Sequence, residues 1–161
     1  MTLIDLLRWA HVVGAAVLLG TGSGIAFFML MAHRTRAPAL IAHVAGTVAL
    51  ADMIFTATAA LLQPVTGAVL AHLVGWPLDT GWIVLSLILY VAIGLLWLPV
   101  VRMQIVMRDL ARAAAAEGTP LPLRYHRLFR LWFWCGVPAF LMVLAIVWLM
   151  VARPAIPGLD T

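Results

Sequence analysis

The residue of this sequence best placed to do chemistry is an aspartate inside a long apolar segment. Asp52 lies near the middle of residues 39–62, which contain no other Asp, Glu, Lys or Arg. An ionised carboxylate in hydrocarbon costs about 2.5–3.5 kcal/mol, so such residues face the interior of a helical bundle and mark functional sites. Thr56 and Gln63 return to the same helical face and extend it into a polar stripe. The alternative is a neutral Asp52 that joins two helices by a hydrogen bond.

A histidine in the first apolar segment is the second candidate. His11 is expected roughly 9 Å from the middle of the bilayer, from about six residues at the helical rise. Gly14, Leu18 and Gly22 continue its face, which leaves room for a neighbouring helix or a flat ligand. An imidazole beside small residues is suited to ligate haem iron while the porphyrin packs on the glycines. The alternative is a histidine that forms a hydrogen bond to another helix.

Two residues on the same side of the membrane extend the haem hypothesis. His72 is a second axial ligand, or a partner in a metal site, only if the segment after Pro64 folds back toward His11. Arg8, one turn before His11, is the nearest cation for haem propionates, although snorkelling to the interface also explains its position. No zinc spacing, phosphate-binding loop or catalytic elbow motif is present in the sequence, so no reaction is identified from motifs.

The third apolar segment supplies candidate partners for Asp52. Ser86 and Tyr90 lie four residues apart and therefore share one side of a helix. Together with Thr56, they are the hydroxyl groups expected to form hydrogen bonds with the Asp52 carboxylate inside the bundle.

The composition shows which elements must position these residues. Of the 161 residues, 65% are hydrophobic and 10% are charged, and the mean hydropathy is +1.11. A single soluble core cannot bury so much apolar side chain, whereas a bilayer accepts it as spanning helices. We expect one all-α integral membrane domain, residues 1–161, built as a four-helix transmembrane bundle in contact with lipid. The expected spans are residues 3–32, 39–62, 82–103 and 131–151. Gln63-Pro64 is expected to break or kink the second helix, which leaves residues 65–75 as a short interfacial or re-entrant segment.

The basic residues set the expected orientation. All ten of them are arginines, and they flank apolar segments, so the basic charge indicates membrane topology and not nucleic-acid binding. The arginines expected on one side are Arg34, Arg36, Arg102, Arg108, Arg112, Arg124, Arg127 and Arg130. That side should face the cytoplasm, because positive charge concentrates there, and both termini should then lie outside.

Several runs of residues, in this order, resemble a known family. They are Trp9-Ala10-His11-Val12-Val13-Gly14-Ala15, Ala51-Asp52, Leu62-Gln63-Pro64-Val65-Thr66-Gly67, Leu96-Trp97-Leu98-Pro99-Val100-Val101, Arg130-Leu131-Trp132-Phe133 and Trp148-Leu149-Met150-Val151-Ala152-Arg153-Pro154. This set resembles the bacterial predicted integral membrane proteins of domain-of-unknown-function family 2269. The resemblance implies four spans in a bacterial cytoplasmic membrane and no established activity.

A weaker similarity extends to the membrane-bound protoporphyrinogen oxidases and to copper resistance protein D. The porphyrin enzymes place a histidine of the first span on haem b, which implies His11 as the counterpart. Three functions remain open on the sequence. They are a haem b-binding redox or electron-transfer protein, a non-enzymatic subunit or assembly factor of a larger membrane complex, and a small proton- or metal-linked transporter that acts as an oligomer.

Overall fold

The first helix begins at an N-terminal cap and ends in a tight turn. The computed structural model describes residues 2–159, and α1 runs from Leu3 to Thr35. Thr2 and Asp5 form a capping box, in which the Thr2 hydroxyl accepts from the Asp5 backbone N–H at 3.2 Å and the carboxylate accepts from the Thr2 backbone N–H at 2.9 Å. The helix ends at Arg36, which adopts the left-handed conformation (φ 56°), and Pro38 starts the next helix.

The second spanning segment is one continuous helix with a wide turn in its middle. It consists of α2 (Pro38–Ala51), the π-helical turn η1 (Asp52–Thr56) and α3 (Ala57–Val74). In η1 the hydrogen bond runs from the Ala57 backbone N–H to the Asp52 carbonyl, five residues back. Such turns insert an extra residue into an α-helix and occur often at functional sites.

The break expected at Gln63-Pro64 does not occur, and the predicted interfacial or re-entrant segment is a continuation of this helix to Val74. Pro64 has no backbone N–H, so the Ala60 carbonyl four residues earlier loses its usual donor. The hydroxyl of Tyr90, on α4, donates to that carbonyl instead. A neighbouring helix therefore satisfies the backbone group that proline leaves free, which is how spanning helices tolerate proline.

The third and fourth spanning helices are longer than their apolar cores. Helix α4 runs from Gly81 to Glu117 and so continues beyond the predicted span, which ended at residue 103. It ends at Gly118, which takes the left-handed conformation (φ 64°) that glycine adopts without strain. Helix α5 runs from Leu123 to Ala152, so residues 123–130, which precede the predicted fourth span, are also helical.

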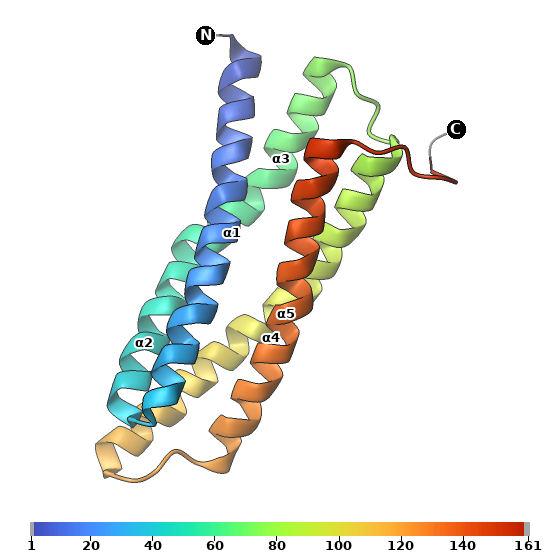
Figure 1. Ribbon diagram of the computed structural model, residues 1–161. Coiled ribbons are helices and arrows are strands. Elements are labelled where there is room, and N and C mark those ends of the chain that lie inside the picture. Colours follow the sequence, from blue (N-terminus) through green and yellow to red (C-terminus); the bar gives the residue numbers. More distant parts are fainter. Residues whose placement is uncertain (1, 160–161) are drawn as a thin grey trace.

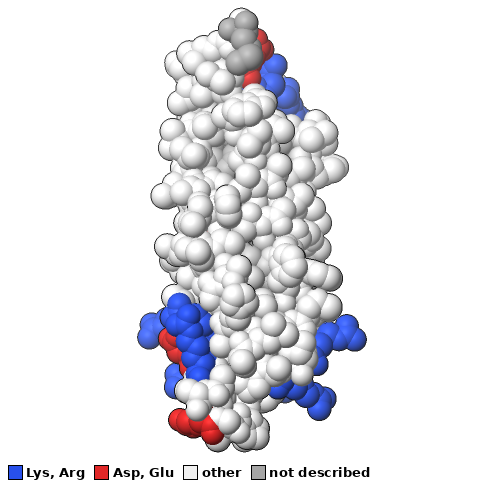
Figure 2. Space-filling view, turned by 90° about the vertical axis from the view of Figure 1, so that its left-hand side faces the viewer, with Lys and Arg blue, Asp and Glu red and all other residues white. Residues whose placement is uncertain are grey.

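All four spanning helices are long and apolar enough to cross a membrane. The described residues form no strand, and the all-α four-helix prediction is confirmed. Both termini lie at the same end of the bundle (Figure 1), which we call the terminal end. Arginine side chains gather at the opposite, arginine-rich end, and a broad band without charged side chains separates the two ends on the face shown in Figure 2.

The two halves of the bundle are packed differently. The main core lies toward the arginine-rich end, where residues from α1, α2, α4 and α5 meet. Its fully buried members include Met29, Ile41, Met107 and Tyr125. Toward the terminal end, α3 packs mainly on α1, whereas α4 packs mainly on α5 around Trp82 and Leu149. The terminal half is therefore built from two helix pairs, each with its own contacts.

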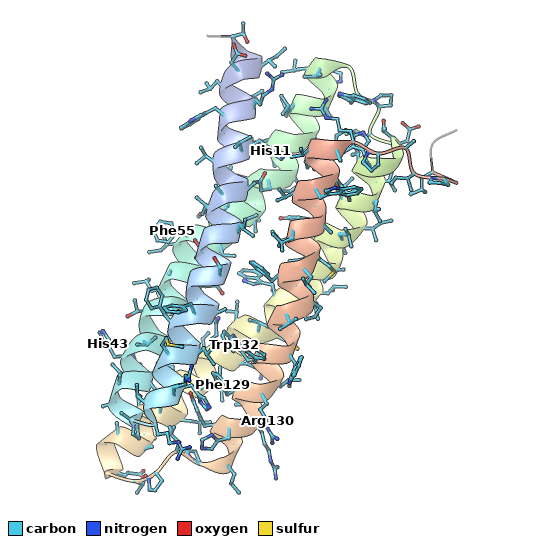
Figure 3. The ribbon with its side chains drawn as sticks, in the orientation of Figure 1. His11, His43, Phe55, Phe129, Arg130 and Trp132 are labelled. Carbon is cyan, nitrogen blue, oxygen red and sulfur yellow. The ribbon has the colours of Figure 1, made fainter. Side chains whose placement is uncertain are left out.

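An aromatic group ties α1 to α5 at the arginine-rich end. The His33 ring stacks on Phe129, with ring centroids 3.7 Å apart and planes 7° apart, and its Nδ1 lies 3.3 Å from the Tyr125 hydroxyl. Phe129 in turn packs against Trp132 (Figure 3). These contacts close the core at the end where α1 and α5 leave the apolar band.

Candidate functional site

A group of polar and small residues joins α1 to α3 in the terminal half. We call it the His11 cluster, and it consists of His11, Gly14, Gln63, Thr66 and Gly67. His11 Nδ1 lies 2.9 Å from the Thr66 hydroxyl, and the Gln63 amide donates to the His11 backbone carbonyl at 2.9 Å. The cluster exists because α3 continues as a helix beyond Pro64 and so carries Thr66 and Gly67 past α1.

The Thr66 hydroxyl is shared between His11 and its own helix. It has one proton, and three acceptors lie within reach of it: the Leu62 carbonyl at 2.8 Å, the Gln63 carbonyl at 3.2 Å and Nδ1 of His11 at 2.9 Å. When the proton is donated to a carbonyl, the hydroxyl accepts from Nδ1, and the neutral imidazole carries its hydrogen there. In that tautomer the lone pair is on Nε2, which makes no hydrogen bond within the described residues.

Two glycines allow the close approach of α1 and α3. A Cβ at Gly14 would lie 2.9 Å from Nε2 of Gln63, and a Cβ at Gly67 would lie 3.1 Å from Cε1 of His11. The glycine face beside His11 is thus partly filled by Gln63. The flat ligand expected to pack on Gly14 would have to displace that side chain.

Gln63 also contributes an acceptor without a donor. The residue is 8% exposed, and its Oε1 atom is buried with no hydrogen-bond partner among the described residues, while its amide nitrogen is used by His11. Buried polar atoms are nearly always paired in folded proteins. The orphaned oxygen therefore marks a place where a water molecule or a donor on a ligand would be stabilised.

His72 and Arg8 are not part of the cluster. His72 is exposed, and it lies six residues after Thr66 on the same helix, about 9 Å along the axis and roughly 240° around it. Its side chain therefore leaves α3 on a different face from the one that contacts His11. Arg8 is exposed on the first turns of α1.

Asp52 forms a second polar site, on the η1 turn. It is 3% exposed, and its carboxylate accepts from Nε1 of Trp97 on α4, at 3.2 and 3.3 Å to the two oxygens. The Thr56 hydroxyl is buried beside the carboxylate, outside the strict geometry of a hydrogen bond. No arginine of the described residues forms an ion pair with Asp52. The side-chain donors beside the carboxylate, Trp97 and Thr56, are therefore both neutral.

The hydroxyl partners expected for Asp52 from α4 are engaged elsewhere. Ser86 is buried and donates to the Trp82 carbonyl of its own helix at 2.7 Å, while Tyr90 donates to Ala60. Trp97 was not recognised from the sequence as the donor. The sequence feature that could have indicated this role is the position of Trp97 well inside the third apolar segment, away from the interface where tryptophans anchor helices. An indole N–H in that position needs an acceptor from another helix.

The residues present fit a haem only in part. An axial ligand needs an imidazole whose ring is oriented through its other nitrogen, and the contact between His11 Nδ1 and the Thr66 hydroxyl orients His11 in this way. The described residues contain no group of three or more His, Cys, Asp or Glu side chains that could hold a metal ion. His11 therefore fits as one axial ligand, and His72, which leaves α3 on a different face, does not complete a second.

Comparison with known proteins identifies the family. The family model for a predicted integral membrane protein, DUF2269, matches residues 5–154. The chain belongs to this family. The DUF2269 match covers the His11 cluster, Asp52 and Trp97 as well as all four spanning helices. No curated protein and no solved structure shows a significant match.

Proposed function

We propose that this DUF2269 protein is a haem b-binding redox protein of the bacterial cytoplasmic membrane, with His11 as an axial ligand. The observation that carries the proposal is the contact between Nδ1 of His11 and the Thr66 hydroxyl, because an Nδ1–H that donates to this hydroxyl leaves the Nε2 lone pair for iron. Ligand histidines are typically oriented by a hydrogen bond from their other ring nitrogen. Haem bound there would supply one-electron transfer within the membrane.

Other residues around His11 would have supporting roles. Gly67 keeps the space beside the imidazole open, since its missing Cβ would otherwise contact Cε1. The orphaned Gln63 oxygen offers an acceptor close to where α1 and α3 meet. Arg8, one turn toward the terminal end, supplies a cation for haem propionates.

The haem proposal predicts a Soret band that depends on one histidine. Protein purified in detergent from haem-replete cells should show this band, and His11→Ala should abolish it because the axial ligand is lost. His72→Ala is the matched control and should keep the spectrum, since His72 is exposed on another face of α3. Thr66→Val should retain haem but shift the reduction potential, because Nδ1 loses its acceptor. Colourless wild-type protein, or an unchanged His11→Ala spectrum, would contradict the assignment.

The second candidate function is proton-linked transport through Asp52. It is favoured by the burial of a carboxylate whose neighbouring side-chain donors are neutral, on a π-helical turn in mid-segment. Intramembrane carboxylates in pumps and transporters bind and release protons. Four spanning helices enclose little space, so this function would need a homo-oligomer. If neither haem nor proton movement is found, a non-enzymatic subunit or assembly factor becomes the leading assignment.

The proposed orientation can be tested with reporter fusions. We propose that the arginine-rich end faces the cytoplasm and both termini face outward, because arginines concentrate in cytoplasmic loops. Alkaline phosphatase fused after Thr161 should therefore be active, and the same reporter inserted at Gly118 should be inactive. The reverse pattern of activities would overturn this topology and place His11 in the cytoplasmic half.

A further inference from the structure

A basic groove lies between α2 and α4 at the arginine-rich end, and its lining includes neither Asp52 nor a residue of the His11 cluster. It has a volume of about 430 Å³. Its lining includes His43, Gly46, Thr47 and Leu50 from α2 and Arg108 and Arg112 from α4. His43 points away from α1 on the side of the bundle that α2 forms (Figure 3), so the groove opens on the outer surface and not into the core.

The two arginines lie over a glycine that leaves room for them. A Cβ at Gly46 would be 3.6 Å from Nη2 of Arg112 and 3.8 Å from Cδ of Arg108. Arg108 is held by Asp109, whose carboxylate accepts from its Nε at 2.9 Å, and this bond leaves the terminal Nη groups available. Arg112 has no ion-pair or side-chain hydrogen-bond partner within residues 2–159. The groove therefore presents one guanidinium group without a counter-ion, that of Arg112, and the free Nη donors of Arg108, which is paired with Asp109.

The groove changes from polar to apolar along α2. Beyond the arginines, His43 and Thr47, it is lined by Leu50, which is 61% exposed, and Ile54 follows one turn later at 50%. These exposed apolar side chains continue the groove along the second spanning helix, away from the arginines. A phospholipid has its groups in the same order, since its charged phosphate is followed by an apolar alkyl chain. A small soluble anion would gain nothing from contact with the apolar part of the groove.

We propose that this groove binds an anionic phospholipid, with the phosphate of its headgroup held by Arg108 and Arg112 and an acyl chain along Leu50 and Ile54. Guanidinium groups pair with phosphate oxygens in a bidentate geometry that adds specificity to charge. Basic pockets between spanning helices recognise lipid headgroups in this way. The site does not depend on haem binding or on proton transfer.

Lipid titration of the full-length protein in detergent, followed by native mass spectrometry, tests the site. Wild-type protein should retain phosphatidylglycerol in preference to phosphatidylcholine. Arg108→Gln/Arg112→Gln should weaken phosphatidylglycerol binding roughly ten- to thirtyfold, from the loss of two surface cations. Arg124→Gln/Arg127→Gln, which removes the same charge from α5 at the same end, should bind it like wild type.

A neutral variant separates the groove from general electrostatic attraction. Gly46→Leu fills the space under the arginines without changing charge, and it should also weaken phosphatidylglycerol binding. Wild-type affinity in Gly46→Leu or in the Arg108/Arg112 double variant would overturn the proposal, as would equal losses in both double variants. Displacement of the lipid by millimolar inorganic phosphate would assign the site to a soluble anion instead. Retention of lipid under that phosphate would support the phospholipid.

Discussion

Replacing Gly14 by leucine should destabilise the protein by about 1–3 kcal/mol, the usual cost of overpacking a close contact. A Cβ at this position already lies 2.9 Å from the Gln63 amide nitrogen and 3.4 Å from its Cδ. The Gln63 side chain is buried and bound to the His11 carbonyl, so it cannot move aside without giving up that hydrogen bond. The larger leucine would push α3 away from α1. Thermal unfolding in detergent, followed by circular dichroism, measures the loss.

Gly20→Leu provides the matched control on the same helix. Nothing lies within 4 Å of a Cβ built at Gly20, and this glycine is exposed. Both substitutions gain the same helix propensity, which favours leucine over glycine by under about 1 kcal/mol. Gly20→Leu should therefore unfold at or slightly above the wild-type temperature. Equal midpoints for the two variants would show that the contact between α1 and α3 does not stabilise the fold.

The Asp52→Leu and Asp52→Asn variants should differ in their free energy of unfolding. Leucine removes the acceptor for the Trp97 indole N–H, which should cost roughly 1 kcal/mol, the size of an interhelical hydrogen bond in a membrane protein. Asparagine keeps an oxygen in the same place and should unfold within a few tenths of a kcal/mol of wild type. A double-mutant cycle with Trp97→Phe measures the coupling, and its absence would contradict the hydrogen bond.

The same variants test the proton-site candidate separately from stability. Asparagine cannot bind and release a proton, so proton flux into proteoliposomes, followed with a pH-sensitive dye, should be lost in Asp52→Asn although its fold is kept. Trp97→Phe is the control, because it removes the donor and leaves the carboxylate. Flux that persists in Asp52→Asn would limit Asp52 to a role in holding helices together.

The number of spanning helices follows from hydropathy, because a bilayer accepts long apolar segments only as helices. The end of the second helix could not be predicted in the same way. Pro64 has a strong local preference to interrupt a helix, and the compensating donor, Tyr90, is 26 residues away in the sequence, on α4. Local patterns also missed the first turns of α5, whose arginines resemble a loop although Tyr125 and Phe129 are buried.

The candidate site was predictable in its residue types and not in its contacts. His11 and Gly14 were identified from the sequence on one helix and Gln63 on another, whereas Thr66 and Gly67 stood out only as part of a family motif. Their meeting depends on how far α3 runs beside α1. The partner of Asp52 was missed because helical spacing finds groups on one face of one helix, whereas Trp97 comes from another helix. Which helices pack together is set by side-chain fit along their whole length.

The η1 turn also sets the angular phase between the two halves of the second spanning helix. A π turn holds one residue more than an α turn, which rotates everything that follows by about 100°. The α2 residues that contact α4 and the α3 residues that contact α1 therefore belong to two different helical stripes joined at Asp52. Deleting one residue from the turn would leave a regular helix of good local geometry. It would nevertheless point Gln63 and Thr66 away from His11, so one extra residue determines whether the His11 cluster exists.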